Sequence, residues 1–193
     1  MTNWIFVGIG AVEIAHRKKV QDCCNEVNRI IQLDEFHSML KDMGPFDFSS
    51  GSADNVIDGE EILRVIAESV DTAIVQTYRP RWPRHRNVNA YVSRKHPADI
   101  YLNAKKLWRP YVSVFETIFH ELIHSLQFLD GHDWDYGHGD NSAAHKDGSA
   151  PRAIPKLASD FLSPEFLRKC KAPTPRPQKL TLWGRVRRML LRF

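Results

Sequence analysis

The feature of this sequence that most constrains its fold is one helix, predicted over residues 113–129. Its apolar side chains recur on nearly every side of the helix, at Phe115, Ile118, Phe119, Leu122, Ile123, Leu126 and Leu129. A helix that is apolar nearly all round packs inside a protein, because no side of it suits water. Ser113 and Glu116 match a capping box at its start, and Asp130-Gly131 is expected to end it.

The polar residues of this helix are concentrated in the pentapeptide His120-Glu121-Leu122-Ile123-His124. Histidines at this spacing project from one face of a helix, so both imidazoles can reach a single ion. A glutamate directly after the first histidine can act on a metal-bound water. Burying such groups in an apolar helix is costly unless they bind something. The pattern therefore predicts a catalytic zinc site on this helix.

A third zinc ligand is expected from residues 130–146, which follow the helix, because a catalytic zinc takes three protein ligands and leaves one position for water. The candidates in this segment are His132, Asp133, Asp135, His138, Asp140 and His145. His138 lies between Gly137 and Gly139, where the backbone can approach the helix closely. This favours His138, and Asp133, Asp135 and His145 remain open as alternatives.

Together these residues resemble the SprT-like (Spartan-type) metallopeptidases, members of the zincins, the zinc peptidases with an HExxH motif. The resemblance rests on a predicted strand at 100–103, a short spacer, the HELIH motif and the Gly-His-Gly at 137–139, and it covers roughly residues 58–146. Two features depart from the family. Asp140-Asn141-Ser142 stands where the family commonly has Pro-Glu and an aromatic residue, and the chain has no CxxC pair for a zinc ribbon.

The resemblance implies that Zn²⁺ is the cofactor and that His120, His124 and His138 are its ligands. It implies that Glu121 is the catalytic base of a zinc metalloendopeptidase, a hydrolase that cuts peptide bonds. Proteins associated with DNA are then the expected substrates. The predicted strand at 100–103 is expected to pair with an extended substrate, and Tyr136 or His145 could help to stabilise the oxyanion.

Other families share parts of this pattern. The segment from Asp133 to Gly137 resembles locally the DxxYG of the aspzincins, in which an aspartate is the third ligand. HELIH also occurs in clostridial neurotoxins and resembles motifs of injected bacterial effectors. The alternatives are therefore a secreted or injected effector-type zincin, a zinc-stabilised binding protein that does not cut, or a hydrolase of non-peptide amides.

The other elements predict an α+β fold, a zincin-like domain in which a small antiparallel sheet packs on helices around the buried HExxH helix. Helical spacing of apolar residues covers 4–43, with a break near Gly8–Gly10, and a second helix is predicted over 58–78. Polar and apolar residues alternate over 87–93, and 99–103 is the second short strand.

Three regions are expected along the chain: a helical region at 1–57, the catalytic domain at 58–171, and a Pro-rich linker with a basic amphipathic tail at 172–193. From Phe166 onward there are nine Lys or Arg and no acidic residue, within a net charge of +4. The tail at 179–193 suits contact with nucleic acid, a membrane surface or a partner protein. The arginine-rich loop Arg79–Arg86 suits nucleic acid.

The cysteines and the hydropathy pattern predict a cytoplasmic protein. Cys23 and Cys24 are adjacent and Cys170 stands alone, which does not make a disulfide framework. The apolar stretch at 4–15 is too short for a membrane span, and its basic residues follow it rather than precede it, the reverse of a secretory signal.

Overall fold

The structure is a computed structural model that describes residues 4–46, 57–69, 72–80, 87–129 and 148–171. The fold is α+β, with helices packed against a four-stranded mixed sheet. The strands are β1 (Phe6–Ile9), β2 (Thr72–Tyr78), β3 (Ala90–Ser93) and β4 (His96–Asn103). The helices are α1 (Ile14–Ile30), α2 (Asp34–Lys41), α3 (Gly59–Glu68), α4 (Tyr111–Leu129), α6 (Ala150–Ser159) and α7 (Pro164–Lys171), with a 3-10 turn at Ala104–Lys106.

The predicted antiparallel pair is confirmed, since β3 runs antiparallel to β4, but the sheet is larger than predicted and mainly parallel, because it also contains β1 and β2. The strand order is β1-β2-β4-β3. β1 and β4 both run parallel to β2, and only β3 is antiparallel, pairing with β4 at the edge of the sheet. β4 therefore has neighbours on both sides, and the prediction that this strand pairs with a substrate is wrong. Among the described strands, β3 is the edge nearest the HExxH helix.

Two predicted helical stretches contain strands instead. The helix predicted over 58–78 does begin at Asp58, whose side chain accepts a hydrogen bond from the backbone N–H of Glu61 at 3.0 Å. It ends at Glu68, and β2 then alternates buried Ala73 and Val75 with less buried neighbours. The apolar residues near position 73 fit both a helical and a strand period, because the segment is short.

The N-terminal segment at 4–43 begins with a strand rather than a helix. β1 lies beside β2, and a Cβ added at Gly10 would come within 2.7 Å of the Ile74 side chain. Gly10 therefore permits the close approach of two segments rather than a break between helices. After β1, α1 and α2 follow as predicted for the rest of this segment.

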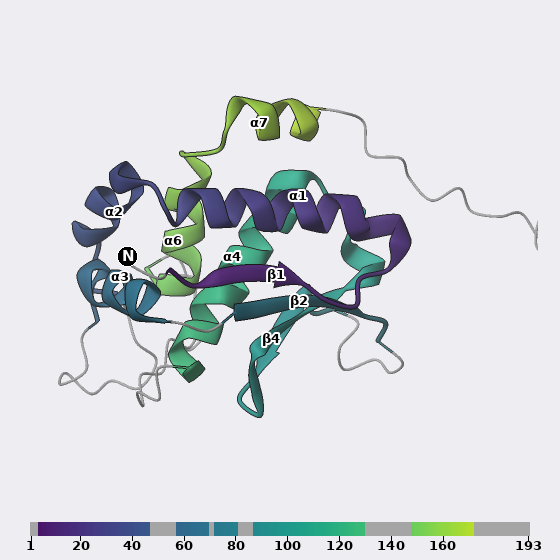
Figure 1. The fold of residues 1–193 in the computed structure, drawn as a ribbon, viewed down its shortest axis with the longest axis horizontal. Helices are drawn as coiled ribbons and strands as arrows, with labels where there is room; N and C mark the ends of the chain where they lie inside the picture. The colour runs from purple at the N-terminus through teal and green to yellow at the C-terminus, as the bar shows by residue number, and fades with distance from the viewer. Residues whose placement is uncertain (1–3, 47–56, 70–71, 81–86, 130–147, 172–193) are drawn as a thin grey trace, which may run out of the picture.

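One hydrophobic core lies on the helix side of the sheet. The strand residues buried there are Val7, Ala73, Val75, Ile100 and Leu102. α1, α4 and α6 lie on this side (Figure 1), and α4 contacts α1, α6 and β4. β1 and α1 belong to the same sheet and core as the later elements, so the core continues across the boundary expected at residue 57.

Two buried polar residues of α1 fix the elements that flank the site. The Asn28 side chain accepts from the Val7 N–H at 2.8 Å and donates to the Val7 carbonyl at 2.9 Å, which holds β1 against α1. The Lys19 ammonium donates to the carbonyls of Leu107 at 3.2 Å and Arg109 at 2.8 Å. Lys19 therefore holds the turn from which α4 begins.

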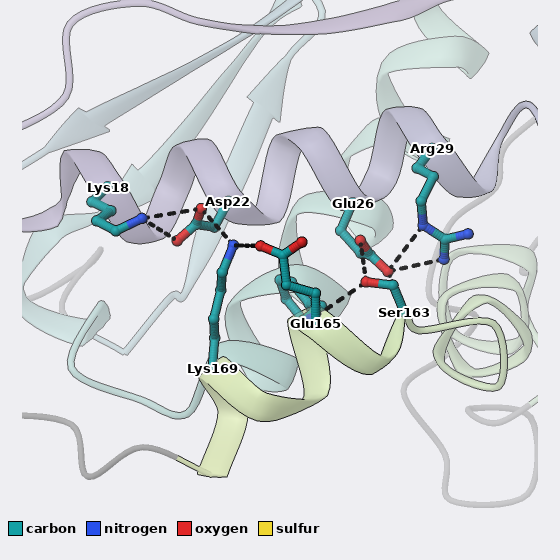
Figure 2. A network of polar contacts seen from close by, with 8 residues as sticks. Lys18, Asp22, Glu26, Arg29, Ser163, Glu165 and Lys169 are labelled. Atoms are coloured by element: carbon teal, nitrogen blue, oxygen red, sulfur yellow. Dashed lines mark hydrogen bonds and ion pairs between the residues drawn. The ribbon is translucent and has the colours of Figure 1, made fainter.

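α7 is attached to α1 by a network of polar contacts (Figure 2). The Glu26 carboxylate accepts from the backbone N–H of Ser163 at 2.6 Å, from its hydroxyl at 3.0 Å and from Arg29 at 2.9 Å. Ser163 in turn accepts from the Phe166 N–H at 3.2 Å, as an N-cap does. Ser163 therefore caps α7, and Glu26 orients its first turn.

Replacing Glu26 should loosen α7. We expect Glu26→Ala to lower the free energy of unfolding by about 2 kcal/mol, because a carboxylate that is 6% exposed and accepts several hydrogen bonds is lost. The urea midpoint, compared with that of wild type, measures this. Lys18→Ala is the matched control, since the Lys18–Asp22 pair belongs to the same network but the lysine is largely exposed. Equal effects of both variants would contradict the role of Glu26.

All three cysteines are free: Cys23 and Cys24 are buried and Cys170 is half-buried. Burial raises the pKa of the Cys24 thiol to about 12, so this thiol stays protonated at neutral pH. None of the described helices is long and apolar enough to cross a membrane.

Candidate active site

The HExxH residues lie on α4, the helix predicted from the sequence. Phe115, Ile118, Phe119, Leu122, Ile123 and Leu126 are all buried, which confirms that α4 is an interior helix. The Ser125 hydroxyl donates to the carbonyl of Pro97 in β4 at 2.5 Å. This contact and the apolar packing fix the rotation of α4 relative to the sheet.

The predicted capping box does not form. α4 begins at Tyr111, two residues earlier, and the Val114 N–H already bonds the Pro110 carbonyl at 3.2 Å. Ser113 instead accepts a hydrogen bond from the Arg109 guanidinium at 3.0 Å, and Glu116 accepts from Ser159 of α6 at 3.4 Å. The side chains that matched the box thus connect α4 to its neighbours.

His120 and His124 lie one turn apart on α4. Their ring centroids are 4.9 Å apart, with the ring planes inclined at 75°, and both side chains are half-buried. Imidazoles so placed can reach one ion from two directions, as a tetrahedral zinc requires. The donor set therefore fits zinc in kind and in placement for two of the three protein ligands that a catalytic site needs.

Glu121 is the buried carboxylate of the site. It is 7% exposed, and burial raises its pKa from the ordinary 4.5 to about 7. A hydrogen bond from the backbone of Val92 acts in the opposite direction and lowers the pKa. Val92 belongs to β3, so Glu121 faces the edge strand. A carboxylate with a pKa near neutrality can both accept and return a proton at physiological pH.

The predicted third ligand lies outside the described residues. His138 and its alternatives Asp133, Asp135 and His145 fall within 130–147, as does Tyr136. Within the part of the chain that the structure describes, no group of three His, Cys, Asp or Glu could hold a metal ion. The described site thus supplies His120 and His124 as a pair, with Glu121 next to them.

A cavity of about 640 Å³ adjoins His120 and Glu121. α4, the segment before β3, and α6 form its walls. Its lining includes Val88, Asn89, Ala90, Arg109, Ser113, Glu116, Thr117, Pro151, Arg152, Pro155 and Lys156. This volume is within the range of sites that take small ligands or a few side chains. His120 and Glu121 therefore face a space large enough for part of a peptide.

Three cations of the cavity wall were not predicted from the sequence. Arg109 comes from the turn before α4, and Arg152 and Lys156 come from α6. Arg109 donates to Ser113 at 3.0 Å and to Thr117 at 3.1 Å, so it is part of the framework of α4. The sequence shows that Arg152 and Lys156 are four residues apart, as on one face of a helix. The position of that face beside α4 depends on tertiary packing.

Of the two segments predicted to contact nucleic acid, the structure describes only the start of the loop Arg79–Arg86. Arg79, at the start of the loop Arg79–Arg86, forms an ion pair with Glu13 at 2.5 Å. Residues 81–86 and the basic tail at 179–193 lie outside the described residues. Arg79 itself is therefore engaged within the protein, and contact with nucleic acid stays a prediction for the rest.

Comparison with known proteins yields no match: no family model, curated protein or solved structure corresponds to this chain. The site residues are therefore interpreted from their own geometry and chemistry.

Proposed function

We propose that this protein is a zinc-dependent metalloendopeptidase of the zincin type. The observation that carries the proposal is the placement of His120 and His124 one turn apart, with the buried Glu121 between them in sequence, beside a cavity of about 640 Å³. The site combines two imidazoles that can bind one metal ion with a carboxylate of raised pKa. These are the groups that metal-assisted hydrolysis uses.

In this mechanism His120, His124 and His138 would hold the zinc. When bound, zinc lowers the pKa of a coordinated water and polarises the carbonyl of the substrate. Glu121, the buried carboxylate next to these ligands, would accept a proton from the attacking water and return it to the leaving nitrogen. The hydrogen bond from Val92 keeps the carboxylate oriented toward β3. The edge strand β3 is the segment beside which an extended substrate would lie.

The SprT-like resemblance supports the choice of reaction and suggests the substrate class, proteins associated with DNA. The mixed sheet, with its antiparallel edge strand next to the HExxH helix, is compatible with this proposal. The loop Arg79–Arg86 and the tail at 179–193 would then bring the enzyme to nucleic acid, a membrane surface or a partner protein.

The metal content of the purified protein tests the proposal. We expect one zinc per chain by elemental analysis of wild type, and a strong reduction in His124→Ala and in His138→Ala, because each variant removes one of three ligands. His37→Ala is the control: His37 lies on α2, where its imidazole contacts the Ile31 carbonyl at 2.8 Å.

The possible results separate the candidate ligands. Zinc retained in His138→Ala but lost in His124→Ala would move the third ligand to Asp133, Asp135 or His145 and weaken the SprT-like proposal. The absence of zinc from wild type, even after purification with added zinc, would contradict the zinc site.

A further inference from the structure

α6 turns two cations toward the cavity beside the HExxH residues. Arg152 and Lys156 are four positions apart and therefore lie on the same face of this helix. Both line the cavity that also contains His120 and Glu121. α6 packs extensively against α4, with Ile154 and Ala158 buried, and this packing fixes the face of α6 that carries the two cations.

Neither cation is neutralised within the described part of the chain. No described residue forms a hydrogen bond or ion pair with the side chain of Arg152 or Lys156. The Nε atom of Arg152 is fully buried and has no hydrogen-bond partner among the residues that the structure describes. A buried guanidinium donor without an acceptor is unusual in a native protein and calls for a group that satisfies it. The planar guanidinium matches a carboxylate in two parallel hydrogen bonds.

The carboxylates of the cavity wall are already engaged. Glu116 accepts a hydrogen bond from Ser159, and its charge acts on Arg109. Glu121 is bound by the backbone of Val92 and serves as the base in the proposed reaction. Among the described residues, the cavity wall therefore carries more positive charge than its acidic residues balance.

We infer that Arg152 and Lys156 form a specificity subsite for an acidic side chain, Asp or Glu, of the peptide substrate. This inference rests on the proposed function, because it assigns a substrate class to the same site. Arg152 would bind the substrate carboxylate through its guanidinium, and Lys156, at the exposed end of the subsite, would attract it electrostatically. The acidic residue would lie near the scissile bond, since the same cavity contains His120 and Glu121.

Peptide binding to a non-cleaving protein tests the subsite directly. The protein is the full-length Glu121→Gln variant loaded with zinc, and the probes are acetylated, amidated heptapeptides of Ala and Gly. One Glu is moved through every position, and each peptide has a counterpart with Gln at that position. We expect calorimetric titration to show about tenfold tighter binding of the Glu peptide at one or two positions, which is the ratio that a favourable carboxylate contact gives.

Charge-removing variants assign the preference to α6. Adding Arg152→Gln and Lys156→Gln to the test protein should abolish the Glu-over-Gln preference. The matched control adds Arg168→Gln and Lys171→Gln, which remove the same charge from α7, away from the cavity, and should keep the preference. The single Lys156→Gln change affects an exposed residue, so it tests the subsite without disturbing packing. It should reduce the preference in part.

Some results would overturn the subsite. Equal binding of the Glu and Gln peptides at every position would do so, and so would a preference that survives the α6 double variant. A third result would also overturn it: the protein binds a single-stranded DNA oligonucleotide through Arg152 and Lys156 but does not discriminate between the Glu and Gln peptides. This face of α6 would then bind phosphate groups rather than a substrate carboxylate. Wild type that cleaves no peptide, with the Glu preference intact, would support the subsite and reject the proposed hydrolysis.

Discussion

Glu121→Gln should reduce the rate of peptide cleavage by about 10²- to 10⁴-fold or more, the contribution of a well-placed general base. Glutamine has nearly the same shape and can still accept the hydrogen bond from the Val92 backbone, so the fold and the metal ligands are preserved. It cannot take a proton from water. Hydrolysis of labelled casein by zinc-loaded protein measures the rate, and elemental analysis of the same sample should show unchanged zinc content.

The control for this experiment is Glu165→Gln, which neutralises a largely exposed carboxylate of α7 away from the cavity. It should cleave at the wild-type rate. Equal activity of Glu121→Gln and wild type would contradict the assignment of Glu121 as the base. Zinc-bound wild type that does not cleave labelled casein or a broad set of peptides would favour a zinc-stabilised binding protein over an enzyme.

The extent of α4 was predictable because its signal is local. The apolar residues from Phe115 to Leu126 follow a helical period, and Asp130-Gly131 comes directly after the helix end at Leu129. The spacing of His120 and His124 then fixes their relative placement, since residues four apart share a helical face. The ring centroids lie 4.9 Å apart, which confirms that the two imidazoles share one face of α4.

The antiparallel pair of β3 and β4 was predicted, but the parallel strands β1 and β2 were missed, because strand pairing is a long-range property. β1 and β2 are far apart in sequence, and their parallel register depends on packing against α1 and on the close approach at Gly10. Residues 72–78 carry apolar groups that fit two periods, and only the neighbouring strands decide between them. β1 and β2 can pair in parallel because α1, α2 and α3 lie between them in the chain and provide the crossover connection that parallel strands need.

Two of the three cavity cations, Arg152 and Lys156, could not be predicted because they come from a helix that follows α4 after an intervening segment. Arg152 and Lys156 look in the sequence like solvated charges on an amphipathic helix. The packing of Ile154 and Ala158 against α4 turns their side of α6 toward His120. The capping box at Ser113 failed for a related reason: Arg109 competes for the serine hydroxyl, and sequence motifs do not include such neighbours.

The stability of the zinc-free protein should fall as the pH rises through the titration of Glu121. Its pKa is 4.5 when unfolded and about 7 in the folded protein, because burial disfavours the charged carboxylate. Between these values the folded state binds more protons than the unfolded state, so raising the pH favours unfolding. This loss of folding stability is absent well below pH 4.5 and reaches its full size above pH 7. At about 1.4 kcal/mol per pKa unit, the full titration amounts to about 3.5 kcal/mol.

Glu121→Gln isolates this effect, because glutamine does not titrate and the other titratable groups are shared by both proteins. Urea unfolding in the presence of a chelator, at intervals from pH 4.5 to pH 8, gives the free energy of unfolding of each protein. We expect the variant to gain about 3 kcal/mol relative to wild type across this range, with most of the gain complete by pH 7. A difference that does not change with pH would mean that the folded protein holds Glu121 at its ordinary pKa, and the buried position of this carboxylate in α4 would then be wrong.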